Sequence, residues 1–229
     1  MRSVIPNALT SLNLIFGVLS ILSTIKADYC LAGIYIILAM IADALDGRAA
    51  RYFGVSGDFG KELDSLCDLG SFGVAPAILI YQYSLSAIGN IAIAVILMFA
   101  VCGAMRLARF NVNVSTVQGF FMGMPIPAAG CMIATFVIAD LQGLSSTIIL
   151  YSVLMLGYLM VSSIKYPDFK GKGNPIKPVS AIITAFSMLY IVYLLGVENI
   201  YRTIPFLVFL SYSLLGIFNS VYCLIFAKR

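Results

Sequence analysis

Six of the chain's ten acidic residues lie within residues 43–68: Asp43, Asp46, Asp58, Glu62, Asp64 and Asp68. The first two are three positions apart and the last two are four apart. If both flanks are helical, each of these pairs projects from one face of its own helix. A charged residue in the middle of a membrane costs roughly 2.5–3.5 kcal/mol, and neighbouring carboxylates repel one another. The spacing therefore predicts a cluster of four carboxylates neutralised by hard divalent cations such as Mg2+.

The elements that position this cluster are membrane helices. The chain has 229 residues, of which 61% are hydrophobic, and its mean hydropathy is +1.01. Its apolar runs are about 20 residues long, which is the length that a helix needs to cross a membrane. We therefore expect an all-α fold, a polytopic integral membrane bundle of about eight transmembrane helices, in a single domain covering residues 1–229.

The pattern of apolar runs and breakers sets the expected helix bounds. Two glycines punctuate the stretch Tyr52 to Gly57, which predicts a turn between the two halves of the acidic segment. The expected helices cover about 1–25, 29–51, 58–80, 87–108, 124–139, 145–164, 179–195 and 201–226.

Several residue types exclude other kinds of chemistry. The chain has no histidine, so a general base must be a carboxylate or a lysine, and histidine-ligated metals are excluded. Its five cysteines form no CxxC pair, which argues against a zinc site or a disulfide framework. The formal charge of +4 is too small to indicate nucleic-acid binding.

The distribution of positive charge predicts the orientation of the bundle. With eight helices both termini lie on one side, and that side receives all of the 14 lysines and arginines except Lys26 and Arg202. Cytoplasmic loops are enriched in these residues. The acidic segment should therefore face the cytoplasm.

The acidic segment also fits a longer pattern, DxxDGxxAR, then eight residues, then GxxxDxxxD. Every specified position is present: Asp43, Asp46, Gly47, Ala50, Arg51, Gly60, Asp64 and Asp68. This stretch resembles the signature of the CDP-alcohol phosphotransferases. The resemblance implies two divalent cations, Mg2+ or Mn2+, that hold the diphosphate of a CDP-linked lipid while an alcohol displaces CMP.

Further stretches resemble the serine-using branch of that family: residues 60–81, 102–112, 122–130 and 159–170. This resemblance implies transfer of a phosphatidyl group, or its ether-lipid counterpart, to the hydroxyl of L-serine in the cell membrane. Relatives are commonly homodimers, so a homodimer is expected. The alternatives are a sister enzyme that uses glycerol phosphate or inositol phosphate and, outside the family, a divalent-cation transporter.

The resemblance also implies roles for individual residues. Asp43, Asp46 and Asp64 are the expected core metal ligands, and Asp68 is a ligand, the base that takes serine's proton, or both. The residues expected at the CDP-lipid are Asn7, Thr10, Gly47, Ala50, Arg51, Ser56 and Gly60. Simple helix capping is the alternative reading of Asn7 and Thr10.

Serine's carboxylate requires a basic partner, and a planar guanidinium can bind it with two parallel hydrogen bonds. Arg106 and Arg109 are three positions apart at the cytoplasmic end of their predicted helix, so both are candidates, with Lys165 as the next. The alternative is that the two arginines are membrane anchors whose side chains reach the lipid headgroups. For Lys165 the favoured alternative is a basic loop that attracts anionic lipid.

Overall fold

Eight apolar stretches fold as helical segments in the computed structural model, which describes residues 4–55, 57–113, 120–141, 144–167, 178–195 and 200–226. Seven of them are the α-helices α1 Val4–Ile25, α2 Tyr29–Phe53, α5 Asn90–Asn113, α6 Ile126–Ala139, α7 Ser146–Val161, α8 Pro178–Leu195 and α9 Ile200–Phe226. The eighth is one continuous segment made of α3 Asp58–Asp68, η1 Leu69–Val74, α4 Ala75–Ile80, η2 Tyr81–Leu85 and η3 Ser86–Ile88.

Length and composition suit these segments to a membrane. Among the described residues, five segments are long and apolar enough to cross it: Val4–Ile25, Tyr29–Phe53, Asp58–Ile88, Asn90–Val112 and Tyr201–Phe226. The shorter apolar helices are Ile126–Ala139, Ser146–Val161 and Pro178–Tyr193. The predicted all-α, multi-pass membrane fold is confirmed, while the count of eight crossings stays a prediction.

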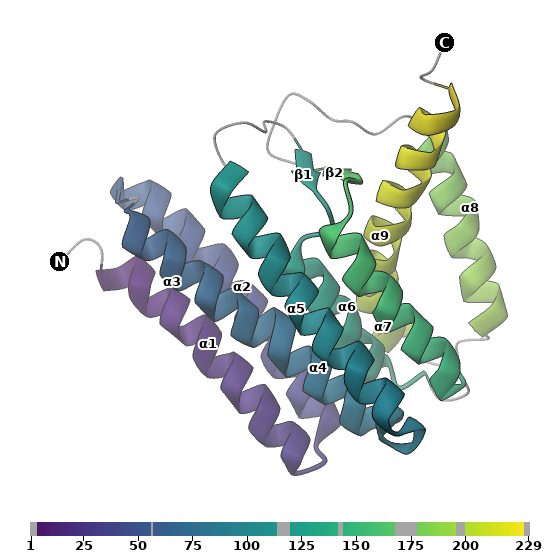
Figure 1. Ribbon diagram of the computed structural model, residues 1–229, viewed down its shortest axis with the longest axis horizontal. Helices are drawn as coiled ribbons and strands as arrows, with labels where there is room; N and C mark the ends of the chain where they lie inside the picture. Colours follow the sequence, from purple (N-terminus) through teal and green to yellow (C-terminus); the bar gives the residue numbers. More distant parts are fainter. Residues whose placement is uncertain are drawn as a thin grey trace.

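The helices form one bundle in which neighbours along the chain often pack together. Figure 1 shows α1, α2 and the α3–α4 segment on one side, α5, α6 and α7 in the middle, and α9 and α8 on the other side. Within it α1 packs on α2, α2 on α6, α5 on α7, α6 on α9, and α8 on α9. The carboxylate-bearing helices thus lie in the N-terminal half of the bundle.

Glycines allow this close packing at particular points. A side chain at Gly17 of α1 would collide with Ser71 of η1. A Cβ atom on Gly130 of α6 would lie 2.7 Å from the main-chain oxygen of Phe72. Small residues let helix backbones approach closely in membranes, where van der Waals contact replaces the hydrophobic effect between helices. These contacts fix the segment that follows Asp68 against both α1 and α6.

The segment after Asp68 departs from α-helical geometry. η1 is a π-helix, with wider i→i+5 hydrogen bonding, and η2 is a second one. π-helical turns are rare and occur most often at functional sites. Pro76 follows near the start of α4. The wide turn of η1 therefore shifts the α-helical register between α3 and α4.

A short antiparallel ribbon was not expected from the sequence. β1 Phe120–Met122 pairs with β2 Lys165–Pro167, and Figure 1 shows the ribbon between α5 and α9. α7 accordingly ends at Val161, three residues before the predicted end, because the chain turns into β2. α5 begins at Asn90 and continues to Asn113, past the predicted end at 108.

Tyr166 anchors this ribbon to α9. Its ring is fully buried, it lies 5.3 Å from the ring of Tyr212 between centroids, and a side chain at Gly216 would collide with it. Tyr212 Oη donates a hydrogen bond to the main-chain oxygen of Pro167 at 3.2 Å. Burial raises the pKa of the Tyr166 phenol, so the group stays neutral.

Candidate active site

A tight turn between α2 and α3 brings the two halves of the acidic segment together. α2 ends at Phe53 and is capped by Gly54, whose left-handed φ of 64° suits glycine and whose N–H donates to the oxygens of Ala50 and Arg51. α3 begins after Gly57, which is extended. The turn begins at Gly54, two residues after the predicted start at Tyr52, because α2 continues to Phe53, and it returns the chain so that the carboxylates of α3 face Asp43 of α2.

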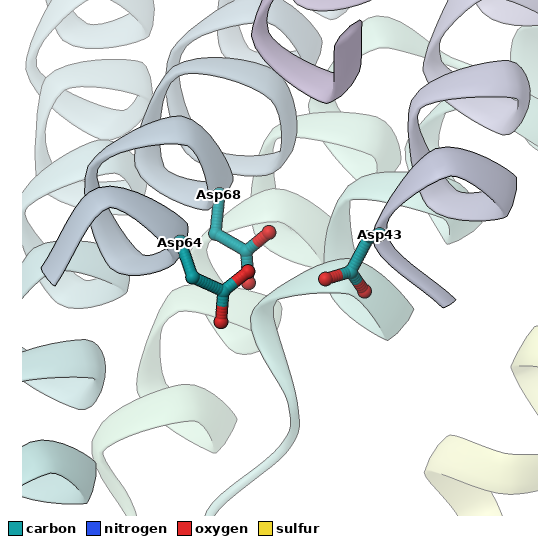
Figure 2. Close-up of side chains that lie close together, drawn as sticks. All are labelled: Asp43, Asp64 and Asp68. Carbon is teal, nitrogen blue, oxygen red and sulfur yellow. The ribbon is translucent and has the colours of Figure 1, made fainter. Parts of the chain in front are cut away.

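Three carboxylates converge across this helix pair. One oxygen each from Asp43, Asp64 and Asp68 can be chosen so that all lie within 4.8 Å of one another. Figure 2 shows the carboxylates of Asp64 and Asp68, from one helix, pointing toward that of Asp43 on the facing helix. The helical spacing thus places the carboxylates together as predicted.

Asp46, the fourth predicted member, lies beside this group. It is buried, with 6% of its surface exposed, and its charge interacts with that of Asp64. It lines a pocket together with Asp64. The four carboxylates therefore form one acidic centre, in which three members converge closely and Asp46 extends it toward the pocket.

This donor set fits a hard divalent cation. Asp46 Oδ2 and Asp64 Oδ1 are buried and have no hydrogen-bond partner among the described residues. Carboxylate oxygens are the ligands that Mg2+ and Mn2+ prefer. Several buried carboxylates close together repel one another, and a bound cation both reduces that repulsion and satisfies the unpaired oxygens.

The pocket next to Asp46 collects most residues predicted to bind the CDP-lipid. It has a volume of about 130 Å3 and lies between the start of α1, the end of α2 and the start of α3. The residues that line it are Pro6, Asn7, Thr10, Asp46, Gly47, Ala50, Val55, Gly57, Gly60, Lys61 and Asp64. An adjoining opening of about 420 Å3 shares Asn7 and Gly60 with it.

Two glycines of the signature, Gly47 and Gly60, line this pocket. A Cβ atom on Gly60 would come within 3.7 Å of Asn7 Oδ1, and one on Gly47 would come within 3.6 Å of Arg51 Nη1. The exposed Arg51 side chain thus lies close to Gly47. Thr10 Oγ1 donates to the oxygen of Pro6 at 3.0 Å, so its hydroxyl also bonds within its own helix. Ser56 lies outside the described residues.

The three candidates for binding serine have different partners. Arg106 is buried, its charge interacts with those of Asp68 and Asp43, and its Nε has no hydrogen-bond partner among the described residues. Lys165 is exposed, and its Nζ lies 4.6 Å from the centroid of the Phe120 ring. Of the three, Arg106 interacts with the carboxylates.

Arg109, although on the same helix, bonds to the main chain. Its Nη1 donates to the oxygen of Val161 at 2.8 Å, and its Nη2 donates to the oxygens of Met122 and Ser162 at 3.0 Å and of Met160 at 3.3 Å. These carbonyls belong to the end of α7, the residue after it, and β1. Arg109 therefore joins α5 to the ribbon and to the open end of α7.

Sequence reasoning missed two polar contacts at this site. Asn13 Nδ2 donates to Asp68 Oδ1 at 3.0 Å, and Asn111 Nδ2 donates to Ser65 Oγ at 3.0 Å. The available signal was an asparagine within an apolar run, three positions after Thr10 and so on the same helix face. Its partner could not be read from the sequence.

Comparison with known proteins finds one matching family and several similar relatives. The CDP-alcohol phosphatidyltransferase family model matches residues 3–162. A Helicobacter pylori protein named CDP-diacylglycerol–serine O-phosphatidyltransferase is 35% identical over 192 residues, covering 81% of this chain and 81% of its own length. A Bacillus subtilis protein of the same name is 38% identical over 166 residues, 72% of this chain and 91% of its own. The archaetidylserine synthase of Methanothermobacter thermautotrophicus is 42% identical over 173 residues, 74% and 72% respectively.

Proposed function

The chain belongs to the CDP-alcohol phosphatidyltransferase family, and we propose that it transfers a phosphatidyl-type group from a CDP-lipid to the hydroxyl of L-serine, releasing CMP. The observation that carries this proposal is the convergence of Asp43, Asp64 and Asp68 beside a pocket that collects the predicted CDP-lipid residues. The relatives named for serine transfer support serine as the acceptor alcohol.

The chemistry is displacement at phosphorus. A bond forms between serine's hydroxyl oxygen and the phosphorus that carries the lipid, and the bond from that phosphorus to the CMP oxygen breaks. The attacking and leaving oxygens lie roughly in line in such reactions. Asp68 is the acceptor of the hydroxyl proton in this proposal, because Arg106, the proposed partner of serine's carboxylate, interacts more strongly with Asp68 than with Asp43.

Asp43, Asp46, Asp64 and Asp68 are the residues that would hold two divalent cations, Mg2+ or Mn2+. When bound, these ions neutralise negative charge on the diphosphate and on the departing CMP. The unpaired oxygens of Asp46 and Asp64 support this assignment.

Arg106 is the proposed partner of serine's carboxylate. It is 6% exposed, so its charge acts in a medium of low dielectric, where charge-assisted hydrogen bonds are strong. Nε is one of the donors of a bidentate guanidinium pair, and it has no partner among the described residues. Both terminal nitrogens of Arg109, Nη1 and Nη2, already donate to main-chain oxygens. This favours Arg106 over Arg109 as the partner of serine.

The pocket beside Asp46 is the proposed site of the CDP moiety. Asn7, Thr10, Gly47, Ala50 and Gly60 line it. Glycines occur where a ligand must approach the main chain closely. Arg51, whose side chain lies close to Gly47, can meet phosphate oxygens, and Ser56 is retained as a further contact.

The site is proposed to face the cytoplasm of a cell membrane, where water-soluble serine can reach it. The excess of lysine and arginine on that side of the predicted topology supports this orientation. A homodimer remains part of the proposal, and cross-linking in membranes would test it.

One assay tests the function. The purified protein in detergent micelles or vesicles is given a CDP-lipid with Mg2+ or Mn2+, and CMP release is followed before and after L-serine is added. We expect CMP release to depend on serine. Release with glycerol phosphate or inositol phosphate instead would identify a sister enzyme, and no release with any acceptor would contradict the proposal.

A further inference from the structure

The buried face of α1 carries an amide that the acidic signature does not include. Asn13 has none of its surface exposed, and its Nδ2 donates to Asp68 Oδ1 at 3.0 Å. Its main-chain oxygen accepts a hydrogen bond from Ser71 Oγ at 2.9 Å. Asn13 therefore contacts the carboxylate-bearing segment twice, once at Asp68 and once at η1.

The bond to Asp68 acts on a carboxylate in a crowded place. Asp68 is 7% exposed and interacts with the charges of Asp43 and Asp64. An amide donor holds one of its oxygens without adding charge to the acidic centre, and it leaves the other oxygen for a cation or for serine's proton. Contacts of this kind orient the groups that act directly.

The same amide costs stability. Asn13 Oδ1 is buried and has no hydrogen-bond partner among the described residues. Burying an unpaired carbonyl oxygen is unfavourable, whereas leucine has a similar shape and no polar atom. Packing alone would therefore favour leucine at position 13. A buried amide that lowers stability while contacting a carboxylate is the pattern expected where activity and stability are traded.

We propose that Asn13 is a positioning residue. It orients the Asp68 carboxylate so that this group can accept the proton of serine's hydroxyl as the hydroxyl attacks phosphorus. This inference rests on the proposed function. Asn13 acts through Asp68, so its loss should slow the displacement step while the binding of CDP-lipid is retained.

The test compares Asn13→Leu with a matched control on the same helix face. Ser20 lies seven positions along α1, is fully buried, and its Oγ also lacks a hydrogen-bond partner among the described residues. Ser20→Ala therefore removes a comparable buried polar atom without touching Asp68. For each protein kcat, KM for serine and for CDP-lipid, CDP-lipid binding and the melting temperature in detergent are measured.

We expect Asn13→Leu to lower kcat about 10- to 100-fold, the usual effect of losing a residue that orients a metal-site carboxylate. CDP-lipid binding and the melting temperature should be unchanged or higher, and Ser20→Ala should match the wild type in kcat. Asn13→Ala provides the same comparison if the leucine variant does not fold. A kcat within about twofold of wild type, or a loss fully matched by Ser20→Ala, would overturn the inference. Failure of the wild type to release CMP with serine would instead refute the proposed function.

Discussion

Replacement of Arg106 by lysine tests whether this residue binds serine. Lysine keeps the positive charge but cannot form two parallel hydrogen bonds with a carboxylate. Arg106 is 6% exposed, so water cannot easily replace the lost bond. A hydrogen bond to a charged group contributes about 1.5–3 kcal/mol, and 1.4 kcal/mol corresponds to about a factor of ten. Loss of one such bond should therefore raise KM for serine about 10- to 100-fold.

The assay is CMP release with serine varied at saturating CDP-lipid, and then with CDP-lipid varied at saturating serine. KM for CDP-lipid should change much less than KM for serine, because the proposed CDP pocket is lined by α1, α2 and α3 residues and not by α5. An unchanged serine KM in a folded Arg106→Lys enzyme would refute the assignment and leave Lys165 as the next candidate.

Arg109→Lys is the matched control, because both arginines lie in the last two turns of α5. Arg109 donates to four main-chain oxygens, and the three donors of a lysine ammonium cannot reproduce that planar pattern. We expect its main effect to be a lower melting temperature, by a few degrees for each kcal/mol lost. A larger effect on serine KM than that of Arg106→Lys would reverse the two roles.

Three further predictions concern the metal centre, the orientation and the packing. Asp64→Asn should abolish turnover and weaken Mn2+ binding measured by calorimetry, whereas Asp68→Asn should lose turnover but retain more CDP-lipid binding; equal loss of that binding would make Asp68 chiefly a metal ligand. Single cysteines at Ser56 and Ser86, in a cysteine-free background, should be labelled from opposite sides of the membrane, and labelling from the same side would contradict the topology. Gly130→Ala should lower stability by about 1–3 kcal/mol, because overpacking displaces the π-helical backbone; an unchanged unfolding midpoint would show that this contact relaxes freely.

Part of the acidic centre was predictable because it is local. Helical spacing places Asp43 with Asp46, and Asp64 with Asp68, on single helix faces, and the packing of α2 and α3 on α1 brings the two pairs together. The pocket at Asn7 and Gly60 followed from family resemblance, and the structure brings those residues together. Their roles in binding stay predictions.

Other features depend on contacts between distant parts of the chain. Arg106 and Arg109 share a helical spacing, yet one interacts with the carboxylates and the other with carbonyls of α7 and β1. No rule of spacing distinguishes them, because their partners lie far away in the sequence. The ribbon escaped prediction because three residues per strand are too few to show an alternating pattern. Asn13 was missed for the same reason as Arg109, since its partner is 55 residues away.

The π-helical turn η1 lets α3 and α4, the two ends of one membrane segment, rotate independently about the helix axis. Upstream, α3 packs on α1 with its carboxylates facing Asp43, and downstream α4 packs on α1 and α6. A wide turn absorbs a change of register that a regular helix would transmit. Substitutions after Val74 in the sequence can therefore adapt the segment to a thicker, thinner or differently composed bilayer without turning Asp64 and Asp68 away from Asp43. Adaptation to the lipid environment and catalysis are thus free to evolve separately.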